Sequence, residues 1–458
     1  MEIITDVQLP ALHADQRRAY KTFLDNRFTA VRCGRRWGKT LFCCILAAEY
    51  AVGDKYASES NGRYVGYFAP EYKFLAEAYT QVHEFLQPVM HRSTRQEGKI
   101  VTRSGGVVDF WSLENEKAGL GRRYHLVVID EAASTKPNMM DIWEKSIKPT
   151  LLDYRGKVIV ASNTKGNDPT NFLWRICNER NVDGGSKYGF VDFHAPTHNN
   201  PSIPVKLVDE NEIDYTRRRQ FELVDDLITN NHPLVYQQEY LAEFVDWSGE
   251  AFFQLERMLV DGKPIDMPKR VDGVFCTIDT ATKTGTSNDG TAVVYWGFNR
   301  IGDGPPLALL DWDVTQIEGS LLETWLPVVF QTGEALAKEC HSRGGFGGAW
   351  IEDKSSGMVL LQHSRRRGWP AHAIDSKLTS VGKDERAISV SGYIHRGDVK
   401  ITKTAHDRVV NYKGVSRNHL LAQVLGFRPG DKEGLREDDL LDDFCYGIAV
   451  GLGNPEGF

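Results

Sequence analysis

Between residues 28 and 162, short apolar runs alternate with longer stretches in which apolar residues recur at helical spacing. This alternation is typical of an α/β domain, in which helices join buried parallel strands. The predicted strands are Phe28–Arg32, Tyr64–Ala69, Val107–Trp111, Leu126–Ile129 and Lys157–Ala161. The first part of the chain is therefore expected to contain a mainly parallel sheet covered by helices.

The pattern changes further along the chain. Residues 198–248 are polar and helical, and glycine and proline then cluster as far as residue 268. Alternation resumes with predicted strands at Gly273–Asp279, Thr291–Phe298, Leu307–Val314 and Ala349–Glu352 and a helix at Leu321–Ser342. Three strands, a helix and a further strand indicate a mixed sheet. We expect a first domain over 1–197, a helical linker subdomain over 198–248, an interdomain linker over 249–268 and a second domain over 269–458.

The composition is that of a soluble protein with two or more domains. The 458 residues are 41% hydrophobic and 26% charged, and no apolar run approaches the roughly 18 residues of a membrane span. The N-terminus lacks the basic and apolar segments of a secretion signal, so we expect action in the cytosol. The seven cysteines form no C-x-x-C pair, which argues against zinc and a disulfide framework. A net charge of -7 argues against nonspecific coating of DNA, but leaves room for a local basic channel.

The stretch Cys33–Thr40 has the sequence context of a phosphate-binding loop. It follows a predicted strand and precedes a predicted helix, so its backbone N–H groups would face a phosphate at the helix N-terminus. Gly38 would allow close approach, Lys39 would neutralise the β- and γ-phosphates of ATP, and Thr40 would ligate Mg²⁺. The usual spacing places glycine where Cys33 stands, so this is a deviant version of the motif.

A strand that ends in two acids supplies the other half of ATPase chemistry. Asp130 is expected to hold the magnesium shell, and Glu131 to polarise the attacking water. The next predicted strand ends in Ser162, Asn163 and Thr164, whose polar groups could sense the γ-phosphate or form an ordinary turn. The two motifs together predict an ATPase.

Phosphoryl transfer also needs positive charge beyond the loop lysine. Within the loop, Arg35, Arg36 and Trp37 are expected at the nucleotide, and either arginine could stabilise the transferred phosphoryl group. Arg122 or Arg123 could do so from a neighbouring subunit, or could be surface charges.

Carboxylates end three predicted elements of the second domain. Asp279 and Glu352 each end a strand, and Asp438, Asp439 and Asp442 open a helix, on which residues four apart share a face. Converging carboxylates repel one another, so such a site makes physical sense chiefly around Mg²⁺ or Mn²⁺. Two ions roughly 4 Å apart would suit phosphodiester cleavage. Each cluster alone could be a solvated loop or helix start, but the set favours a nuclease.

With these motifs the whole chain resembles the large terminase subunit of tailed double-stranded DNA bacteriophages, a DNA packaging motor. The resemblance is carried by Leu12–Arg17, Gly34–Thr40, Val127–Ala133, Ser162–Gly166, Gln238–Phe244, Ile278–Ala281, Ile351–Gly357 and Asp438–Asp442. It implies an α/β fold in which a P-loop NTPase domain of the ASCE, RecA-like kind precedes an RNase H-like nuclease domain with a mixed sheet.

The resemblance also implies roles for single residues. Gln16 would recognise adenine, and the segment from Ser162 to Thr164 would couple hydrolysis to movement. Asp279, Glu352 and either Asp439 or Asp438 would be metal ligands. Asn163 departs from the threonine of many relatives, and Asp443 replaces a usually small residue, which adds a further candidate ligand.

The function implied is ATP-driven translocation of double-stranded DNA into a procapsid, with a two-metal endonuclease that cuts concatemeric DNA. The implied partners are a portal protein, a small terminase subunit and further copies of the chain in a ring, expected to be pentameric. The implied location is the host cytoplasm, docked transiently on the procapsid, with no membrane and no place in the virion. The alternatives are an ATP-dependent helicase-nuclease of repair or defence, which would carry a second motor domain, and a non-catalytic DNA clamp.

Overall fold

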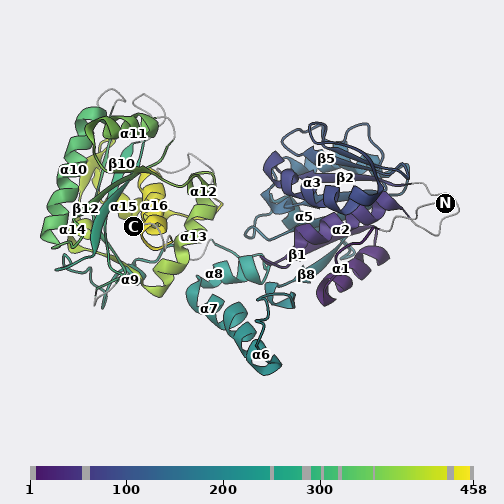
Figure 1. The fold of residues 1–458 in the computed structure, drawn as a ribbon, viewed down its shortest axis with the longest axis horizontal. Coiled ribbons are helices and arrows are strands. Elements are labelled where there is room, and N and C mark those ends of the chain that lie inside the picture. Colours follow the sequence, from purple (N-terminus) through teal and green to yellow (C-terminus); the bar gives the residue numbers. More distant parts are fainter. Residues whose placement is uncertain are drawn as a thin grey trace. The chain divides into compact units, whose positions relative to one another are not determined.

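The computed structural model describes residues 7–53, 62–247, 252–280, 290–300, 304–317, 322–353, 356–430 and 438–453. The chain divides into two compact units (Figure 1). Unit 1 comprises Met1–Leu227 and Pro233–Asp246, and unit 2 comprises Ile228–His232 and Trp247–Phe458. None of the described helices is long and apolar enough to cross a membrane.

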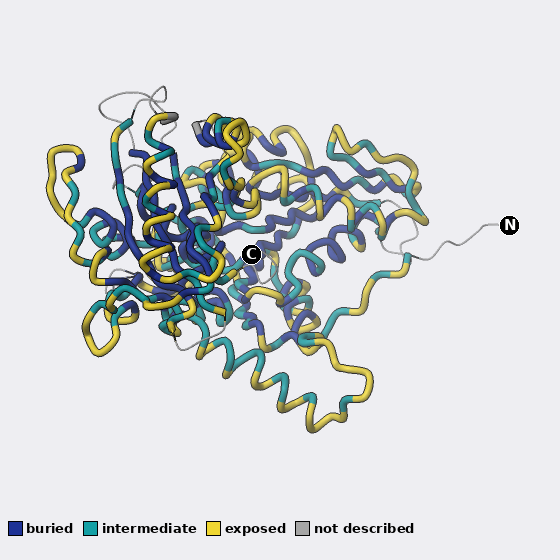
Figure 2. The backbone as a smooth tube through the Cα atoms, turned by 60° about the vertical axis from the view of Figure 1, so that its left-hand side comes forward, coloured by how far each residue is buried: buried dark blue, intermediate teal, exposed yellow. Residues whose placement is uncertain are grey.

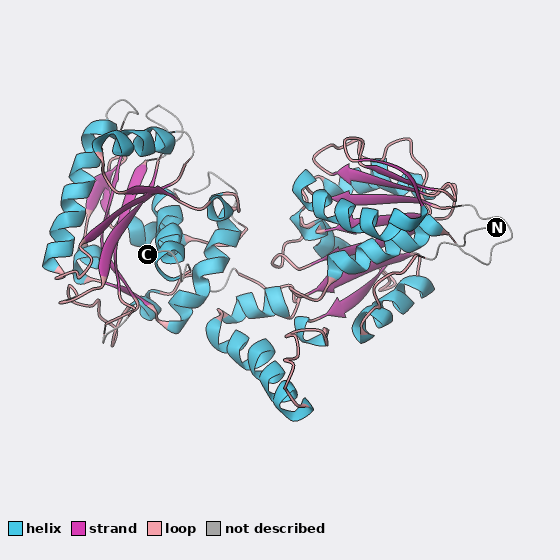
Figure 3. Cartoon of the chain, in the orientation of Figure 1, coloured by secondary structure: helices cyan, strands magenta, loops and turns pink. Residues whose placement is uncertain are grey.

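Unit 1 is built on an eight-stranded sheet with the order β3-β4-β5-β2-β6-β7-β1-β8. Strands are magenta in Figure 3. The six strands from β5 to β8 in this order are parallel, and β4 pairs antiparallel with β3 and β5. The strands are β1 Phe28–Cys33, β2 Tyr64–Ala69, β3 Met90–Thr94, β4 Lys99–Thr102, β5 Val107–Ser112, β6 Leu126–Asp130, β7 Lys157–Ser162 and β8 Phe190–Ala195. All five predicted strands are present, and the mainly parallel sheet is confirmed.

Helices cover both faces of this sheet, which explains why its central strands are apolar on both sides. α1, α2 and α3 contribute Phe23, Leu46 and Val82 to one core, and α4 and α5 contribute Met139 and Ile176 to the other. The burial of the strands is visible in Figure 2. The helices from residue 14 to residue 235 are α1 Ala14–Asp25, α2 Lys39–Val52, α3 Tyr72–Leu86, α4 Met139–Ile142, α5 Phe172–Asn178, α6 Glu212–Gln220, α7 Asp226–Asn230 and α8 Pro233–Val235.

Unit 2 contains a six-stranded mixed sheet with the order β13-β12-β9-β10-β11-β14. β10 is antiparallel to β9 and β11, whereas the remaining pairs are parallel. The strands are β9 Gly273–Asp279, β10 Thr291–Phe298, β11 Leu307–Thr315, β12 Phe346–Ile351, β13 Ala371–Ala373 and β14 Val399–Ile401, with a separate hairpin of β15 Val410–Tyr412 and β16 Val415–Arg417. The predicted order of three strands, a helix and a strand is confirmed, and the helix is α10.

Helices also cover both faces of the second sheet. α10 and α11 contribute Leu326 and Leu360 to the core on one face. α16 crosses β10 on the other face so closely that a Cβ on Gly447 would lie 2.0 Å from Trp296 Nε1. The helices are α9 Leu255–Met258, α10 Leu322–Glu339, α11 Ser356–Arg367, α12 Ser376–Thr379, α13 Lys383–Arg396, α14 Lys403–Asp407, α15 His419–Gly426 and α16 Asp439–Leu452.

The stretch predicted as an interdomain linker packs on unit 2 wherever it is described, from residue 252 onward. Phe252 and Phe253 are buried, and the Phe253 ring lies 5.8 Å from the ring of Phe444. The Ile265 amide donates to the Ile401 carbonyl over 2.9 Å. Aromatic burial and a backbone hydrogen bond therefore attach this stretch to unit 2. Residues 249–251 of the predicted linker lie outside the described residues.

Candidate nucleotide site and acidic site

The stretch Gly34–Gly38, here called the phosphate loop, joins the end of β1 to the start of α2. Gly38 has φ 94°, which is costly for any residue with a Cβ, and Arg36 has φ 64°. Cys33, at the position of the usual first glycine, is the fully buried last residue of β1. Burial raises the pKa of its thiol to about 12. The cysteine is therefore a neutral part of the core and not a phosphate contact.

The glycine at position 34 is required by close packing. A Cβ there would lie 2.3 Å from Thr197 Oγ1 and 2.4 Å from the Tyr240 carbonyl oxygen. The Gly34 amide also donates to the Ala195 carbonyl over 2.9 Å. The displaced glycine thus allows the chain after β8 and the segment around Tyr240 to contact the loop.

The N-terminal segment fixes the other side of the phosphate loop. Trp37 is fully buried, and its Nε1 donates to Asp15 Oδ2 over 2.9 Å. His13 Nε2 lies 3.0 Å from the Trp37 carbonyl oxygen, and Gln16 Nε2 donates to the Gly38 carbonyl over 3.1 Å. The amide group of Gln16, predicted to recognise adenine, therefore contacts the loop backbone in this structure.

Lys39 and Glu131 are paired at the carboxyl edge of the sheet. Lys39 Nζ lies 2.7 Å from Glu131 Oε1, and both side chains are partly buried. Burial alone lowers the pKa of Lys39, but Glu131 and the other negative groups nearby raise it on balance above its ordinary value. The structure thus brings the predicted phosphate-binding lysine and the predicted catalytic acid together.

Asp130 ends β6 beside this pair and is nearly fully buried. Tyr67 of β2 donates its hydroxyl to Asp130 Oδ2 over 2.9 Å, and the Thr40 side chain is also hydrogen-bonded to this carboxylate. Burial and the neighbouring Glu131 raise the pKa of Asp130 above its ordinary value. Because β1 and β6 are parallel strands separated by β7, their carboxyl ends meet at one edge of the sheet.

The three predicted coupling residues follow β7 between these two motifs. Ser162 Oγ accepts the Ala133 amide over 3.1 Å. Asn163 Nδ2 donates to Glu239 Oε2 over 3.1 Å, and the Thr164 hydroxyl bonds the backbone of the same later segment. The chain after β7 therefore contacts the residues after β6 and the stretch near residue 239.

The two loop arginines have different surroundings. Arg35 Nε lies 2.6 Å from Glu239 Oε2, and Glu239 is only 1% exposed. Burial would raise the pKa of Glu239, but Arg35 lowers it on balance. Because the Glu239 carboxylate is buried, removing its cation is costly, so Arg35 is expected to stay with Glu239. Arg36 is exposed, and no hydrogen bond or ion pair of its side chain occurs among the described residues.

Arg122 and Arg123 are remote from the loop of the same chain. Arg122 Nε lies 3.9 Å from Asp109 Oδ2 on β5, and its guanidinium lies 5.7 Å from the centre of the Trp111 ring. β5 is four strand positions from β1, which corresponds to about 19 Å. Arg123 is largely exposed and lies 3.8 Å from Asp153. Neither arginine reaches this phosphate loop from its own chain.

In unit 2, two of the predicted acids come together through strand register. β9 and β12 pair in parallel with Ile278 opposite Ile351, so Asp279 and Glu352 follow at the same end of the sheet. The Tyr446 hydroxyl of α16 donates to Glu352 Oε1 over 3.1 Å. Burial, followed by the repulsion of nearby carboxylates that include Glu352, raises the pKa of Asp279 well above its ordinary value.

The start of α16 adds carboxylates to this end of the sheet. Asp439 Oδ2 accepts the Gly290 amide over 3.1 Å and the Tyr412 hydroxyl over 3.3 Å. Asp443 is fully buried, and burial raises its pKa well above the ordinary value. The Asp443 carbonyl accepts the Thr277 hydroxyl over 3.2 Å, which attaches the helix to β9.

The other two predicted ligands are paired with cations of α13. Lys383 Nζ lies 2.8 Å from Asp438 Oδ2, and the nearly fully buried Arg386 is paired with Asp442 Oδ1. The Arg386 guanidinium also lies 4.5 Å from the centre of the Tyr446 ring. These cations distinguish Asp438 and Asp442 from Asp439, a distinction for which sequence spacing gave no signal.

The donor chemistry of unit 2 fits a hard divalent cation. Asp279, Glu352 and Asp439 offer only oxygen donors, as Mg²⁺ and Mn²⁺ prefer. Within the described ranges, no three His, Cys, Asp or Glu side chains are close enough together to form a complete metal site. Ligation would therefore require the carboxylates to approach one another.

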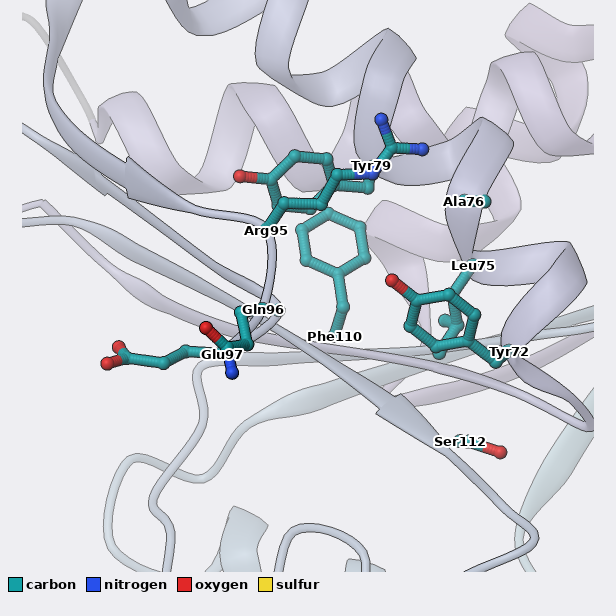
Figure 4. Close-up of a pocket in the computed structure, with 10 residues that line it drawn as sticks. Tyr72, Leu75, Ala76, Tyr79, Arg95, Gln96, Glu97, Phe110 and Ser112 are labelled. Carbon is teal, nitrogen blue, oxygen red and sulfur yellow. The ribbon is translucent and has the colours of Figure 1, made fainter.

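A separate cleft of about 190 Å³ lies on unit 1 between α3 and the hairpin of β3 and β4 (Figure 4). Tyr72, Tyr79 and Phe110 line it, and the Arg95 guanidinium lies 6.0 Å from the centre of the Tyr79 ring. None of the predicted site residues lines this cleft.

Comparison with known proteins gives matches among solved structures alone, since neither models of protein families nor curated protein sequences match this chain. The large terminase of the thermophilic bacteriophage D6E, solved in complex with ADP, matches with a TM-score of 0.58 at 12% identity, covering 95% of this chain and 98% of that one. The HK97 bacteriophage large terminase matches with a TM-score of 0.34 at 13% identity, covering 97% of this chain and 96% of that one. The ATPase domain of the Thermus phage P74-26 large terminase matches with a TM-score of 0.37 at 17% identity, covering 51% of this chain and 94% of that one. The predicted fold is therefore confirmed, and this chain has the two-domain fold of a large terminase.

Proposed function

We propose that this protein is the ATP-driven DNA packaging motor of a tailed double-stranded DNA virus, in which unit 1 hydrolyses ATP and unit 2 cuts DNA. One observation carries the proposal: a single chain with the terminase fold combines two kinds of site. In unit 1 a phosphate loop meets an acidic pair at the carboxyl edge of a parallel sheet. In unit 2 carboxylates converge at one end of a mixed sheet.

In unit 1 the phosphate loop binds ATP, and Lys39 leaves Glu131 to contact the β- and γ-phosphates. Thr40 and Asp130 would hold the Mg²⁺ that neutralises phosphate charge. Glu131, once released, polarises the attacking water. Arg36, which is exposed and lies beside the fixed Arg35, supplies further positive charge.

A second source of positive charge is a neighbouring subunit. Arg122 is held on β5 by Asp109 and Trp111, remote from its own loop, and this supports a role in trans. Arg123 is a second candidate for this role, because its side chain is more exposed than that of Arg122 and is thus accessible to a neighbouring subunit. Either role requires a ring of subunits, for which a pentamer is expected.

In unit 2, Asp279, Glu352 and Asp439 would hold Mg²⁺ or Mn²⁺, which supplies activation of water and stabilisation of the leaving oxygen when bound. Tyr446 orients Glu352 by its hydrogen bond. Lys383 and Arg386 balance the charge of Asp438 and Asp442 and so limit repulsion among the carboxylates.

The motor acts on double-stranded DNA in the host cytoplasm, docked on a portal protein, with a small subunit that selects the packaging site. A helicase-nuclease would carry a second motor domain. The described part of unit 2 instead forms a mixed sheet in which β10 is antiparallel to both neighbours. This topology supports the packaging motor over that alternative.

The test is packaging in vitro with procapsids, ATP and linear DNA, because only a packaging motor protects the DNA from added nuclease. Glu131→Ala should keep ATP binding but lose turnover and DNA protection. Unchanged ATP turnover in this variant would contradict the motor. ATP turnover by the unmodified protein without protection of the DNA would favour the helicase-nuclease. Asp279→Asn should lose metal-dependent plasmid cleavage, and persistent cleavage would contradict the ligand assignment.

A further inference from the structure

The segment Tyr236–Phe244 lies against the carboxyl ends of the strands that carry the nucleotide site. Arg32 of β1 donates through Nη1 to the Ala242 carbonyl over 2.9 Å. The Thr164 hydroxyl, just beyond β7, donates to the Gln238 carbonyl over 3.0 Å. The segment is therefore attached to β1 and to the chain after β7, although it is remote from both in sequence.

Glu239 is the residue of this segment that contacts the phosphate loop. Its Oε2 accepts Arg35 Nε over 2.6 Å and Asn163 Nδ2 over 3.1 Å. Its Oε1 accepts Gln238 Nε2 over 2.9 Å, and its carbonyl accepts the Arg35 amide over 2.8 Å. One buried carboxylate thus joins the phosphate loop, the end of β7 and the segment itself.

We propose that Glu239 is a positioning residue that makes the phosphate loop, the end of β7 and the segment Tyr236–Phe244 move as one body when nucleotide binds. A buried carboxylate that loses its cation keeps only its neutral hydrogen-bond donors, here Asn163 and Gln238, and this is costly. The loop and the segment therefore stay joined when the loop adjusts to phosphate. The segment ends just before Asp246, the last residue of unit 1. The inference rests on the proposed ATPase, and it adds a route by which nucleotide affects the chain leading out of unit 1.

Asn163 has a defined part in this junction. Its amide nitrogen donates to the same Glu239 oxygen that Arg35 contacts. Asn163 therefore links the chain after β7 to the loop through Glu239.

The test is hydrogen exchange in the full chain, with and without ADP and Mg²⁺. In the unmodified protein, ADP should change the protection of amides in Tyr236–Phe244. In Glu239→Gln this change should disappear, and the affinity for ADP should fall about tenfold. The melting temperature of the variant measures any loss of stability. Adding Arg35→Ala to Glu239→Gln should cause no further loss of affinity, because both changes break the same contact.

Glu243→Gln is the matched control, since this side chain is in the same segment but is 48% exposed and pairs with Arg32. It should keep the response to ADP. An unaltered response in Glu239→Gln, or additive losses in the double variant, would overturn the inference. If Glu239→Gln does not fold, Asn163→Ala tests the same junction and should reduce the response to ADP.

Lys39→Ala separates this inference from the proposed function. If Lys39→Ala still hydrolyses ATP, the ATPase proposal fails. If Lys39→Ala loses nucleotide binding and Glu239→Gln behaves as the unmodified protein, only the role of Glu239 fails.

Discussion

Lys39 Nζ and Glu131 Oε1 lie 2.7 Å apart, so the residue expected to grip phosphate and the residue expected to activate water hold each other. Glu131 has φ 52°, an uncommon backbone conformation for a residue with a side chain. Strained residues of this kind concentrate at functional sites. In the proposed ATPase, nucleotide binding separates this pair, so Glu131 becomes free to act only when Lys39 has a phosphate partner.

Glu131→Gln is therefore expected to bind ADP more tightly while it hydrolyses ATP far more slowly. The amide removes the charge that competes with phosphate for Lys39. A partly exposed ion pair contributes up to about 1 kcal/mol, which corresponds to about fivefold in affinity. Titration calorimetry measures the affinity, and Glu114→Gln, at an exposed acid, is the control. Weaker ADP binding by Glu131→Gln would show that the ion pair between Lys39 and Glu131 does not oppose nucleotide binding.

Gly34→Ala is expected to destabilise unit 1 by about 1–3 kcal/mol, the usual range for overpacking. The added methyl group would meet Thr197 Oγ1 at 2.3 Å and the Tyr240 carbonyl at 2.4 Å. Urea unfolding measures the loss, and hydrogen exchange of the β1 peptide assigns it to unit 1. Gly185→Ala is the control, because a methyl group there meets only the flexible end of Asp183, at 3.2 Å. Equal stability of both variants would contradict the packing role of Gly34.

Several of the strands that the sequence predicted are buried almost continuously, among them β2, β6 and β9. β2 and β9 are buried along nearly their whole length, and their predicted bounds coincide with the observed ones. β3 is mostly exposed, and β13 has three residues, so neither carries an apolar signal. A short or exposed strand forms because it pairs with a neighbouring strand of the sheet. The local sequence pattern does not show which strand that neighbour will be.

The residues of the two candidate sites also divide into those that the sequence predicted and those that it did not. Lys39 and Glu131 belong to local motifs, and both were predicted. Tyr67, which bonds Asp130, and Arg386, which pairs with Asp442, act across the fold on acids far away in sequence. No spacing rule identifies such partners, because only the fold brings them together.

Among the acids at the start of α16, Asp439→Asn should abolish DNA cleavage, whereas Asp442→Asn should retain most of it. Asp442 is committed to Arg386, so its loss removes a counter-ion and not a metal donor. Arg386→Met should cost up to about 3 kcal/mol in unfolding free energy, because it leaves the partly buried Asp442 carboxylate without its cation. Plasmid cleavage with Mn²⁺, corrected for the folded fraction, measures the difference. Equal loss in both aspartate variants would make Asp442 a ligand.

Stabilisation of unit 2 by divalent cations is expected to grow with pH. Burial and then neighbouring carboxylates raise the folded-state pKa of Asp279 above its ordinary value of 3.8, and burial does the same for Asp443. The folded protein therefore binds protons more tightly than the unfolded chain, so without metal its stability falls as pH rises from near 3.8 through the raised values. A bound cation offsets this repulsion only where the carboxylates are ionised.

The melting temperature with MnCl₂, compared with that in EDTA, measures this effect at about pH 5 and at about pH 8, both above the ordinary pKa of an aspartate carboxyl. The increase should be larger at the higher pH, because protons compete with the cation at the lower one. Asp279→Asn should be more stable than the unmodified protein in EDTA at the higher pH, since it removes a buried charge, and it should gain less from MnCl₂. A metal-dependent increase that is larger at the lower pH, or that Asp279→Asn leaves intact, would place the cation away from these carboxylates.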